Sequence, residues 1–355
     1  MTRQAFRRLG AVAFAAALFV VLVACGTDVT GDTGEQAAEE GGGQSTLTIY
    51  SGRNEELVGG ILEHLEDTTG YEIEVRYGDS AELAAQLLEE GDRTDADLFF
   101  SQNAGALGAL REAGMLRELP ERTLEVAPER FRASDGTWVG TSARARVVVY
   151  DPDQVDVDDV PGSIDELVDE TWEGEVGYAP SNASWQSFVT ALRVLDGEQA
   201  ARDWLMDFRA NEPEAFESNT PILEAVDSGE IALGLINHYY HQAWVTERGA
   251  GAVNAERHHP DGGDALGLVN VAGVGVLDTS EAPEAAVHAI DFLLSGTAQQ
   301  YFADETAEYP MRQDVTSTRH ELGELDELPG PDIDLSRLST LDDTLELLRD
   351  VGLSS

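Results

Sequence analysis

The chain has almost no cysteine and no lysine at all. Cys25 is the single cysteine among 355 residues, so no disulfide can form within one chain. All 22 basic residues are arginines, and 68 acidic residues give a formal net charge of −46. Nucleic acid requires a basic footprint, so this balance argues against a nucleic-acid partner. The acid excess has two possible interpretations. One is a solubilising surface suited to high salt, which the even spread of the acids favours, and the other is a surface potential that attracts cations to a binding site.

Long apolar runs are also scarce, and the one near the N-terminus is short. Three arginines precede an apolar run over residues 11–24 that is too short for a confident membrane span. The run ends at Cys25 in a pattern that resembles a bacterial lipobox, which implies cleavage before Cys25 and lipidation of its thiol. Without that context, a lone cysteine is a small buried hydrophobe. We therefore expect a signal peptide over residues 1–24, whose removal leaves 19 of the 22 arginines against 68 acidic residues, a net charge of −49.

Residues 25–45 lack aromatic side chains and are rich in Gly, Thr and acidic residues. This composition is typical of a flexible, acidic tether, which here would begin at the lipidated cysteine. A tether of this kind holds a folded body off a membrane. We therefore expect an extracytoplasmic protein, lipid-anchored to the outer face of the cell membrane. The remaining chain is long enough for two lobes with separate cores.

From residue 46 onward, strand patterns alternate with helix patterns. Residues 46–50 are alternating and β-branched, whereas residues 55–68 carry apolar side chains at helical spacing. Such alternation predicts a mainly parallel sheet that binds ligands at the carboxyl ends of its strands. Further strands are expected at 71–77, 97–100, 138–150, 172–178, 231–236 and 265–277, and further helices at 81–90, 103–113, 185–195, 199–209, 220–228, 282–294 and 341–348.

Two neighbouring tyrosines stand in the stretch Ile-Asn-His-Tyr-Tyr-His-Gln, which begins at Ile236. Tyr239 and Tyr240 follow the strand expected at 231–236. Adjacent strand residues point to opposite faces, so both can reach one ion only where the strand ends. Phenolates are hard oxygen donors that suit Fe(III), and a bound cation removes the phenol proton despite an ordinary pKa of about 10. The alternative for such a pair is packing in a core or an interface.

In five segments the chain resembles the ferric-iron-binding family of ABC-importer solute-binding proteins: TLTIYSGRNEEL, ADLFFSQNAGAL, WVGTSARARVVVYD, ESNTPILEAVDSGEIALGLINHYYHQAW and AEYPM. The resemblance runs from Thr46 to the C-terminal helix. It implies an α/β, two-lobed periplasmic-binding-protein-like fold. Each lobe would be a mainly parallel sheet flanked by helices, and two crossover strands near 146–150 and 268–277 would join the lobes. The predicted limits are 46–145 plus 270–355 for lobe 1 and 146–269 for lobe 2.

The resemblance also implies a metal site in which Tyr239 and Tyr240 bind Fe(III) as paired tyrosinates. The family often has His and Glu ligands at two positions that are Asn54 and Gln102 here, and Ser184 stands where some members have a third tyrosine. Asn54 and Gln102 are therefore the expected further ligands. Because amides are neutral and weak toward Fe(III), either a bound anion and water complete the shell or the iron arrives chelated.

A synergistic carbonate or phosphate opposite the tyrosines is a further implication of the family. Arginine and the backbone N–H groups at a helix start are suited to hold an oxyanion. Two of the matching residues could instead have a purely structural role. Arg144 could form a surface salt bridge, and Asn219 could cap a helix that begins near residue 220. The implied anion-binding residues are Arg144, Ser181, Asn182, Ala183, Asn219 and Asn237.

Three classes of function are compatible with these features. The first is a monomeric lipoprotein that captures Fe(III) and delivers it to an ABC permease in the membrane. The second is a protein of the same fold that binds a ferric chelate or a small organic anion. The third is an extracellular enzyme, against which the sequence argues because it contains no nucleophile elbow, no HExxH motif and no P-loop.

Overall fold

The computed structural model describes residues 46–354, and ten strands in this range form one curled sheet. The predicted signal peptide, the tether and the lipidation site Cys25 lie outside the described residues. The strands are β1 (Thr46–Ser51), β2 (Glu72–Tyr77), β3 (Leu98–Ser101), β4 (Val139–Tyr150), β5 (Val176–Tyr178), β6 (Glu214–Ala215), β7 (Leu233–Asn237), β8 (Glu256–His258), β9 (Val269–Val276) and β10 (Tyr309–Pro310).

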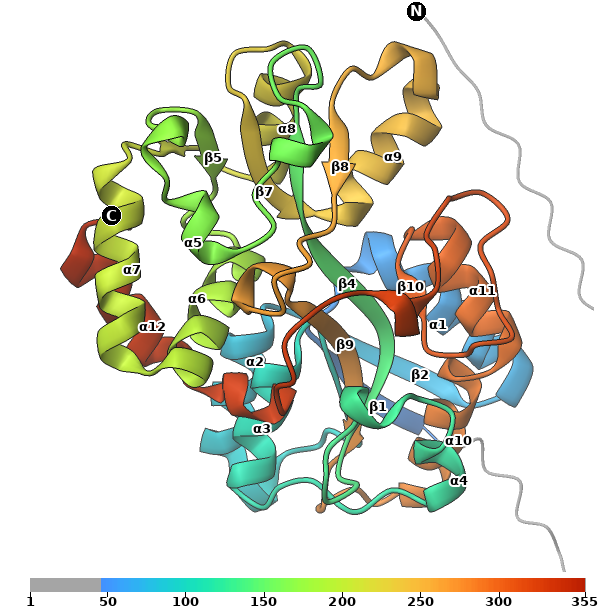
Figure 1. Cartoon of the computed structure of the whole chain (residues 1–355). Helices are drawn as coiled ribbons and strands as arrows, with labels where there is room; N and C mark the ends of the chain where they lie inside the picture. The colour runs from blue at the N-terminus through green and yellow to red at the C-terminus, as the bar shows by residue number, and fades with distance from the viewer. Residues whose placement is uncertain (1–45, 355) are drawn as a thin grey trace, which may run out of the picture. The chain divides into compact units, whose positions relative to one another are not determined.

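The sheet is parallel toward both ends and antiparallel in the middle. Its strand order is β2-β1-β3-β9-β4-β7-β5-β6, and β8 and β10 both pair with β4. At one end β1 pairs in parallel with β2 and β3, and at the other β5 pairs in parallel with β6 and β7. The antiparallel pair of β4 and β9 lies between these two parts (Figure 1). The predicted α/β fold is thus present as two partly parallel parts of one continuous sheet, joined by antiparallel strands in the middle.

The long strand β4 belongs to both parts of the sheet. Its first segment pairs with β9 as far as the pair Ala145 and Val269. From Arg146, which pairs with Asn237, the strand pairs with β7 instead. All twelve residues of β4 are buried. The change of partner between Ala145 and Arg146 therefore marks the point where the chain crosses from one part to the other.

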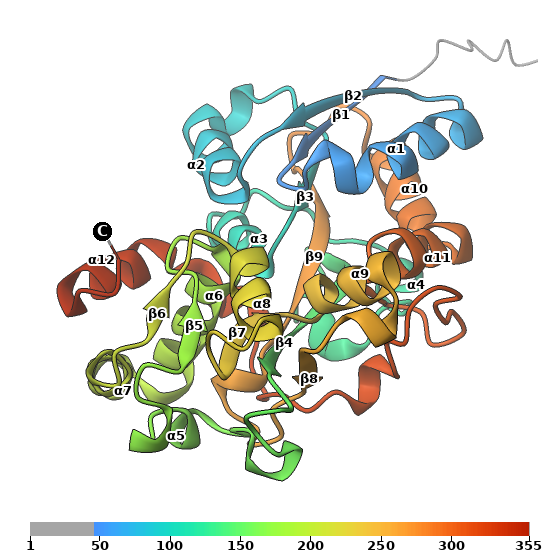
Figure 2. The ribbon, with the colours of Figure 1, turned by 90° about the horizontal axis from the view of Figure 1, so that it is seen from above.

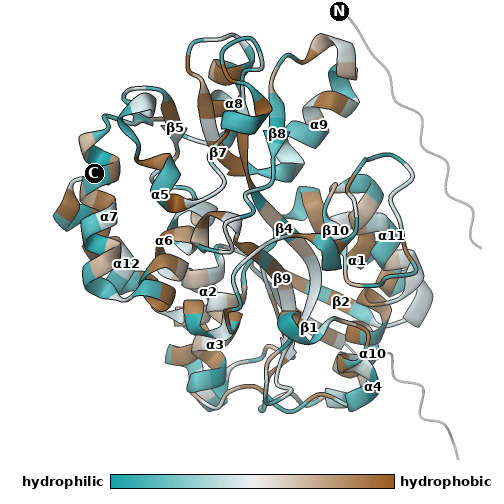
Figure 3. Cartoon of the chain, in the orientation of Figure 1, coloured by the Kyte–Doolittle hydropathy of each residue, from teal (hydrophilic) through white to brown (hydrophobic). Residues whose placement is uncertain are grey.

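Twelve α-helices of residues 46–354 cover the sheet. Their inner faces are apolar; the buried residues of α1, for example, are Val58, Ile61, Leu62 and Leu65, at helical spacing. Figure 3 shows hydrophobic residues on the central strands and on parts of the surrounding helices. None of the described helices is long and apolar enough to cross a membrane. The helices are α1 (Glu55–Thr69), α2 (Ser80–Glu90), α3 (Ala104–Glu112), α4 (Glu121–Leu124), α5 (Ile164–Leu167), α6 (Ala183–Asp196), α7 (Glu198–Ala210), α8 (Asn219–Asp227), α9 (His238–Arg248), α10 (Pro283–Leu293), α11 (Gly296–Glu305) and α12 (Leu341–Val351).

The sequence did not predict every element correctly. The strand expected over 172–178 is limited to Val176–Tyr178, because Glu170–Trp172 form a 3-10 turn and Gly174 adopts a φ of 76°. Helices α9 and α11 were not predicted, and neither were the short elements α4, α5, β6, β8 and β10. The sequence of α9 has no clear apolar stripe. In agreement, only three of its eleven residues are buried.

The C-terminal segment contacts both parts of the molecule. A 3-10 helix, Leu335–Ser339, packs on α3, and Trp138 donates a hydrogen bond from Nε1 to Ser336 Oγ at 3.1 Å. The chain then enters α12, which packs against α6 and α7 (Figures 1 and 2). The last helix therefore lies on the part of the sheet that contains β5 and β7.

Substitution of Gly108 tests the close packing of this segment on α3. A Cβ added at Gly108 would lie 2.1 Å from the backbone oxygen of Ser336, which cannot move freely. We expect Gly108→Ala to lower the free energy of unfolding by about 1–3 kcal/mol, measured by urea denaturation. Gly59→Ala in α1 is the control: its Cβ meets only the flexible Glu55 side chain, at 3.4 Å, so it should raise stability by about 0.5–1 kcal/mol. Equal effects of the two variants would contradict the packing argument.

Candidate metal centre

A cavity of about 360 Å³ lies beside the point where β4 changes its partner strand. Its lining comes largely from residues that follow the carboxyl ends of β1, β3, β5 and β7, where α/β sheets bind their ligands. The cavity thus has the location that the alternating sequence pattern predicts. Eight of the sequence-predicted site residues line it: Asn54, Gln102, Arg144, Asn182, Ala183, Asn237, Tyr239 and Tyr240.

The two tyrosines stand in the first turn of α9, immediately after β7. The strand spans Leu233–Asn237, so it ends one residue later than the predicted 231–236, and the chain turns into a helix at His238. Because the turn follows directly, Tyr239 and Tyr240 are no longer forced to opposite faces. Their rings stack with centroids 4.5 Å apart and planes 29° apart, and both side chains line the cavity. Both rings are half-buried rather than enclosed in the apolar core.

The environment of Tyr239 keeps its phenol protonated when no cation is bound. Burial raises the pKa of Tyr239 well above its ordinary value, and Tyr240 adds to the effect, while Arg144 opposes it. A strongly charged cation reverses this preference, because it stabilises the phenolate directly. The tyrosine pair is therefore suited to bind a trivalent ion with release of protons.

His238, which directly precedes the tyrosine pair, has a structural role. It is fully buried, its Nδ1 accepts a hydrogen bond from the Ala145 backbone N–H at 3.3 Å, and its Nε2 donates to the Ala307 carbonyl at 2.8 Å. Burial lowers the pKa of His238 to about 3, so the ring is neutral. Both ring nitrogens already have partners, and His238 ties the start of α9 to β4 and to Ala307.

A buried ion-pair network supports the side of the cavity that holds Arg144. Glu308 accepts two hydrogen bonds of 2.9 Å from Arg53 and one of 2.6 Å from Ser142, and Arg144 Nη1 lies 3.5 Å from it. Arg144 Nη2 also donates to the backbone oxygen of Gln102. Burial by itself would raise the pKa of Glu308, but its two arginine neighbours and its hydrogen bonds lower it to about 2. Arg144 is therefore held in place within the protein and is not a surface salt bridge.

The amide side chains around the cavity differ in whether their oxygen atoms already accept hydrogen bonds. Asn54 caps α1, with Oδ1 accepting from the Leu57 N–H at 3.1 Å. Asn182 caps α6, and its Oδ1 accepts from both the N–H and the hydroxyl of Ser184. Gln102 Oε1 is buried and has no hydrogen-bond partner within residues 46–354. Of the two amides predicted as metal ligands, Gln102 thus has the freer oxygen.

Two sequence-predicted residues do not line the cavity. Ser181 is exposed in the turn before α6. Asn219 is buried as the first residue of α8, and Ser218 occupies the N-cap position. The reading of Asn219 as a helix cap was therefore wrong by one residue, because α8 begins earlier than the sequence suggested.

Comparison with known proteins identifies the family of the chain. The sequence profile described as "Bacterial extracellular solute-binding protein" matches residues 94–332. The chain belongs to this family. The major ferric iron-binding protein of Neisseria meningitidis serogroup B is 30% identical over 309 residues, which are 86% of this chain and 93% of that protein.

Solved structures give the same assignment. Iron-bound HitA from Pseudomonas aeruginosa is 33% identical, with a TM-score of 0.78 over 87% of this chain and 99% of that chain. The Trichodesmium protein IdiA (FutA), in complex with iron and citrate ligands, is 25% identical, with a TM-score of 0.76 over 87% of this chain and 100% of that chain. The expected resemblance to the iron-binding branch of these solute-binding proteins and the expected two-lobed fold are confirmed. The family consists of extracytoplasmic binding components of ABC importers, not of enzymes.

Sequence reasoning missed two residues that shape the site of this solute-binding protein. Arg146 lines the cavity two positions after Arg144, and Glu308 pairs with Arg53 and Arg144. A signal for Arg146 was present, because residues i and i+2 of a strand share one face. If Arg144 faces the cleft, Arg146 must face it as well. Glu308 could not be found in this way, because it is distant in the chain from β4. It lies in AEYPM, one of the segments that carry the resemblance, but that segment by itself does not indicate which arginines Glu308 contacts.

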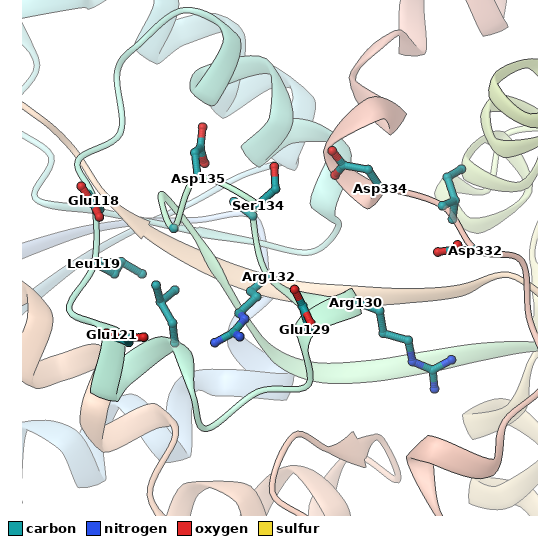
Figure 4. Close-up of a pocket in the computed structure, with 14 residues that line it drawn as sticks. Glu118, Leu119, Glu121, Glu129, Arg130, Arg132, Ser134, Asp135, Asp332 and Asp334 are labelled. Atoms are coloured by element: carbon teal, nitrogen blue, oxygen red, sulfur yellow. The ribbon is translucent and has the colours of Figure 1, made fainter.

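A larger cavity, of about 880 Å³, lies away from the tyrosines. It is lined by six acidic residues together with Arg130 and Arg132. Figure 4 shows the labelled acidic side chains spread around its rim rather than converging on one point. Within residues 46–354 no group of three or more His, Cys, Asp or Glu residues is placed to hold a metal ion. The tyrosine-lined cavity is therefore the stronger candidate site despite its smaller volume.

Proposed function

We propose that this solute-binding protein captures Fe(III) through the tyrosinates of Tyr239 and Tyr240 and that a synergistic anion, carbonate or phosphate, completes the coordination. The observation that carries the proposal is the stacked tyrosine pair at the wall of a cavity where two parts of the sheet meet. Ferric iron-binding relatives of similar length support it. Gln102 and Asn54 would be the weaker metal ligands.

The anion would bind opposite the tyrosines, on Arg144 and the residues that begin α6. Asn182, Ala183 and Asn237 line the cavity with Arg144 and support this assignment. Ser181 and Asn219 lie outside the lining, so they would contribute only after a rearrangement. The N-terminus of α6 favours negative charge through its free N–H groups.

Capture would couple to closure of the two lobes. We propose limits of 46–145 plus 270–355 for lobe 1 and 146–269 for lobe 2. The change of β4 partner at residue 146 supports this division, although α12, within the predicted range of lobe 1, contacts α6 and α7 of lobe 2. Because ligand residues come from both lobes, binding favours the closed arrangement.

A specific observation favours a second candidate, a ferric chelate or a small organic anion as the ligand. The residues that match the family's His and Glu ligands are the neutral Asn54 and Gln102. The related Trichodesmium protein was solved with iron and citrate ligands. A chelator would bring the carboxylates that this chain lacks at those positions.

The protein would work at the membrane surface. We propose cleavage before Cys25, lipidation of its thiol and a tether over residues 25–45 that lets the folded body reach an ABC permease. We further propose that it acts as a monomer. Globomycin, an inhibitor of lipoprotein signal cleavage, should cause a larger precursor to accumulate, and an unchanged product would contradict the anchor.

Titration of the iron-free protein with ferric salt plus carbonate, and with ferric citrate, tests the proposal and the role of Arg144. Tyrosinate bound to Fe(III) absorbs visible light by charge transfer, so a coloured complex is expected. Arg144→Gln should raise the carbonate concentration needed for half-maximal colour by about tenfold or more, because it removes a charge-assisted hydrogen bond. A loss that is independent of added anion would contradict the role of Arg144, and colourless wild-type protein would contradict the function.

A further inference from the structure

Arg146 is a buried arginine that the proposed iron chemistry does not use. It lies on β4 two residues after Arg144 and lines the same cavity, with 3% of its surface exposed. Its Nη1 donates to Ser184 Oγ at 3.2 Å, and its guanidinium carbon is 5.6 Å from the centre of the Phe188 ring. Its Nε and Nη2 atoms have no hydrogen-bond partner among residues 46–354. These two atoms form one edge of the guanidinium fork.

No carboxylate of the described residues forms a salt bridge with Arg146. Arg53 and Arg144 share the single buried carboxylate of Glu308. All three guanidinium groups are buried, and among the described residues Arg146 is the one of the three without a salt bridge. A buried charge without a partner is strongly destabilising, so an occupant that supplies negative charge would relieve this penalty. Burial lowers the pKa of Arg146 to about 10, which leaves it charged at neutral pH.

Neutral donors on the lining also favour an anion. The N-cap residues of four helices line the cavity: Asn54 of α1, Asn103 of α3, Asn182 of α6 and Asn237 of α9. Each helix is at least nine residues long, and its N-terminus carries partial positive charge. The cavity is thus electropositive within a chain whose net charge is −46.

We infer that Arg146 is the second arm of a two-arginine site, with Arg144, that binds a multiply charged oxyanion. The inference rests on the proposed function and deepens it. Fe(III) bound by two tyrosinates keeps one positive charge, Arg146 adds one, and Arg53, Arg144 and Glu308 together add another. The exposed Glu56 is the one carboxylate among the lining residues. A monovalent anion would leave most of this excess uncompensated, whereas phosphate, carbonate or the carboxylates of a ferric chelator would offset more of it.

The experiment compares full-length, iron-free wild-type protein with Arg146→Gln. One measurement is the rise in melting temperature caused by phosphate, carbonate, citrate or acetate without iron. The other is the anion concentration that gives half-maximal ferric colour. We expect Arg146→Gln to raise the half-saturating concentration of the multivalent anions by about ten- to hundredfold. Acetate should have little effect on either protein. A response to citrate alone would assign the oxyanion to a chelator, and a response to phosphate or carbonate would assign it to a free anion.

Stability separates an anion-binding role from a structural one. Removing an unpaired buried charge should leave the anion-free melting temperature of Arg146→Gln equal to or above that of the wild type. A lower melting temperature with an intact anion response would overturn the inference. Arg122→Gln is the matched control, because its side chain is 71% exposed in α4 and the variant loses the same charge. If the wild type gives no ferric colour but its anion response still depends on Arg146, the iron proposal fails and this inference stands.

Discussion

Replacement of both Tyr239 and Tyr240 by Phe is expected to abolish the visible charge-transfer band of the ferric protein. The two phenols are the only anionic-oxygen ligands among the residues assigned to the metal, and the change removes both oxygens while keeping the stacked rings. Loss of a residue that only supports a ligand typically lowers metal affinity by about 10- to 100-fold, and loss of both tyrosinates should lower the affinity for Fe(III) by more than that. Absorbance titration with ferric salt and carbonate measures both quantities.

Tyr71→Phe is the matched control for this double variant. Tyr71 lies outside the cavity, and its hydroxyl lies 3.0 Å from His288 Nδ1 near the surface. Its loss should leave the band unchanged. Single variants at Tyr239 and Tyr240 should each weaken and shift the band, because one phenolate remains. A persistent, unshifted band in the double variant would show that the iron binds elsewhere.

Glu308→Gln is expected to produce a large loss of stability. Glu308 is 2% exposed and holds Arg53, which is fully buried, through two hydrogen bonds of 2.9 Å. Without the carboxylate, Arg53 and Arg144 are left as buried cations without a counter-charge. Breaking one partner of a buried pair costs about 3–5 kcal/mol, so urea denaturation at neutral pH should show a decrease of that size. Glu305→Gln, which removes an exposed pair with Arg319, should change stability by no more than about 1 kcal/mol.

The same variant should change how stability depends on pH. The pKa of Glu308 is lowered to about 2 in the folded protein, below the value of a free Glu, about 4.3. Its contribution is therefore fully present above the unfolded pKa and is lost as the pH falls toward 2. The difference in unfolding free energy between wild type and Glu308→Gln should shrink over this acid range. A difference that stays constant with pH would mean that the carboxylate does not act through its charge.

Much of the fold follows from short-range pattern. The alternation of strands and helices from residue 46, the apolar spacing of α1 and the strand that ends before the tyrosines are local properties, and the structure has them where the sequence places them. Helix α9 was missed because its stability depends on contacts made by a few residues rather than on an apolar stripe. His238, for example, is fixed by Ala145 and Ala307, which are distant in the chain.

By itself, the sequence determined the family, the carboxyl-end location of the site and the tyrosine pair, because each is carried by neighbouring residues or by the order of segments. The tertiary structure decided which charges meet. It brought Glu308 to Arg53 and Arg144, gave Arg146 no carboxylate partner from residues 46–354, and kept Ser181 and Asn219 outside the cavity. The physical reason is that charge pairing acts through space between residues far apart in the chain, whereas strand and helix patterns act between close neighbours.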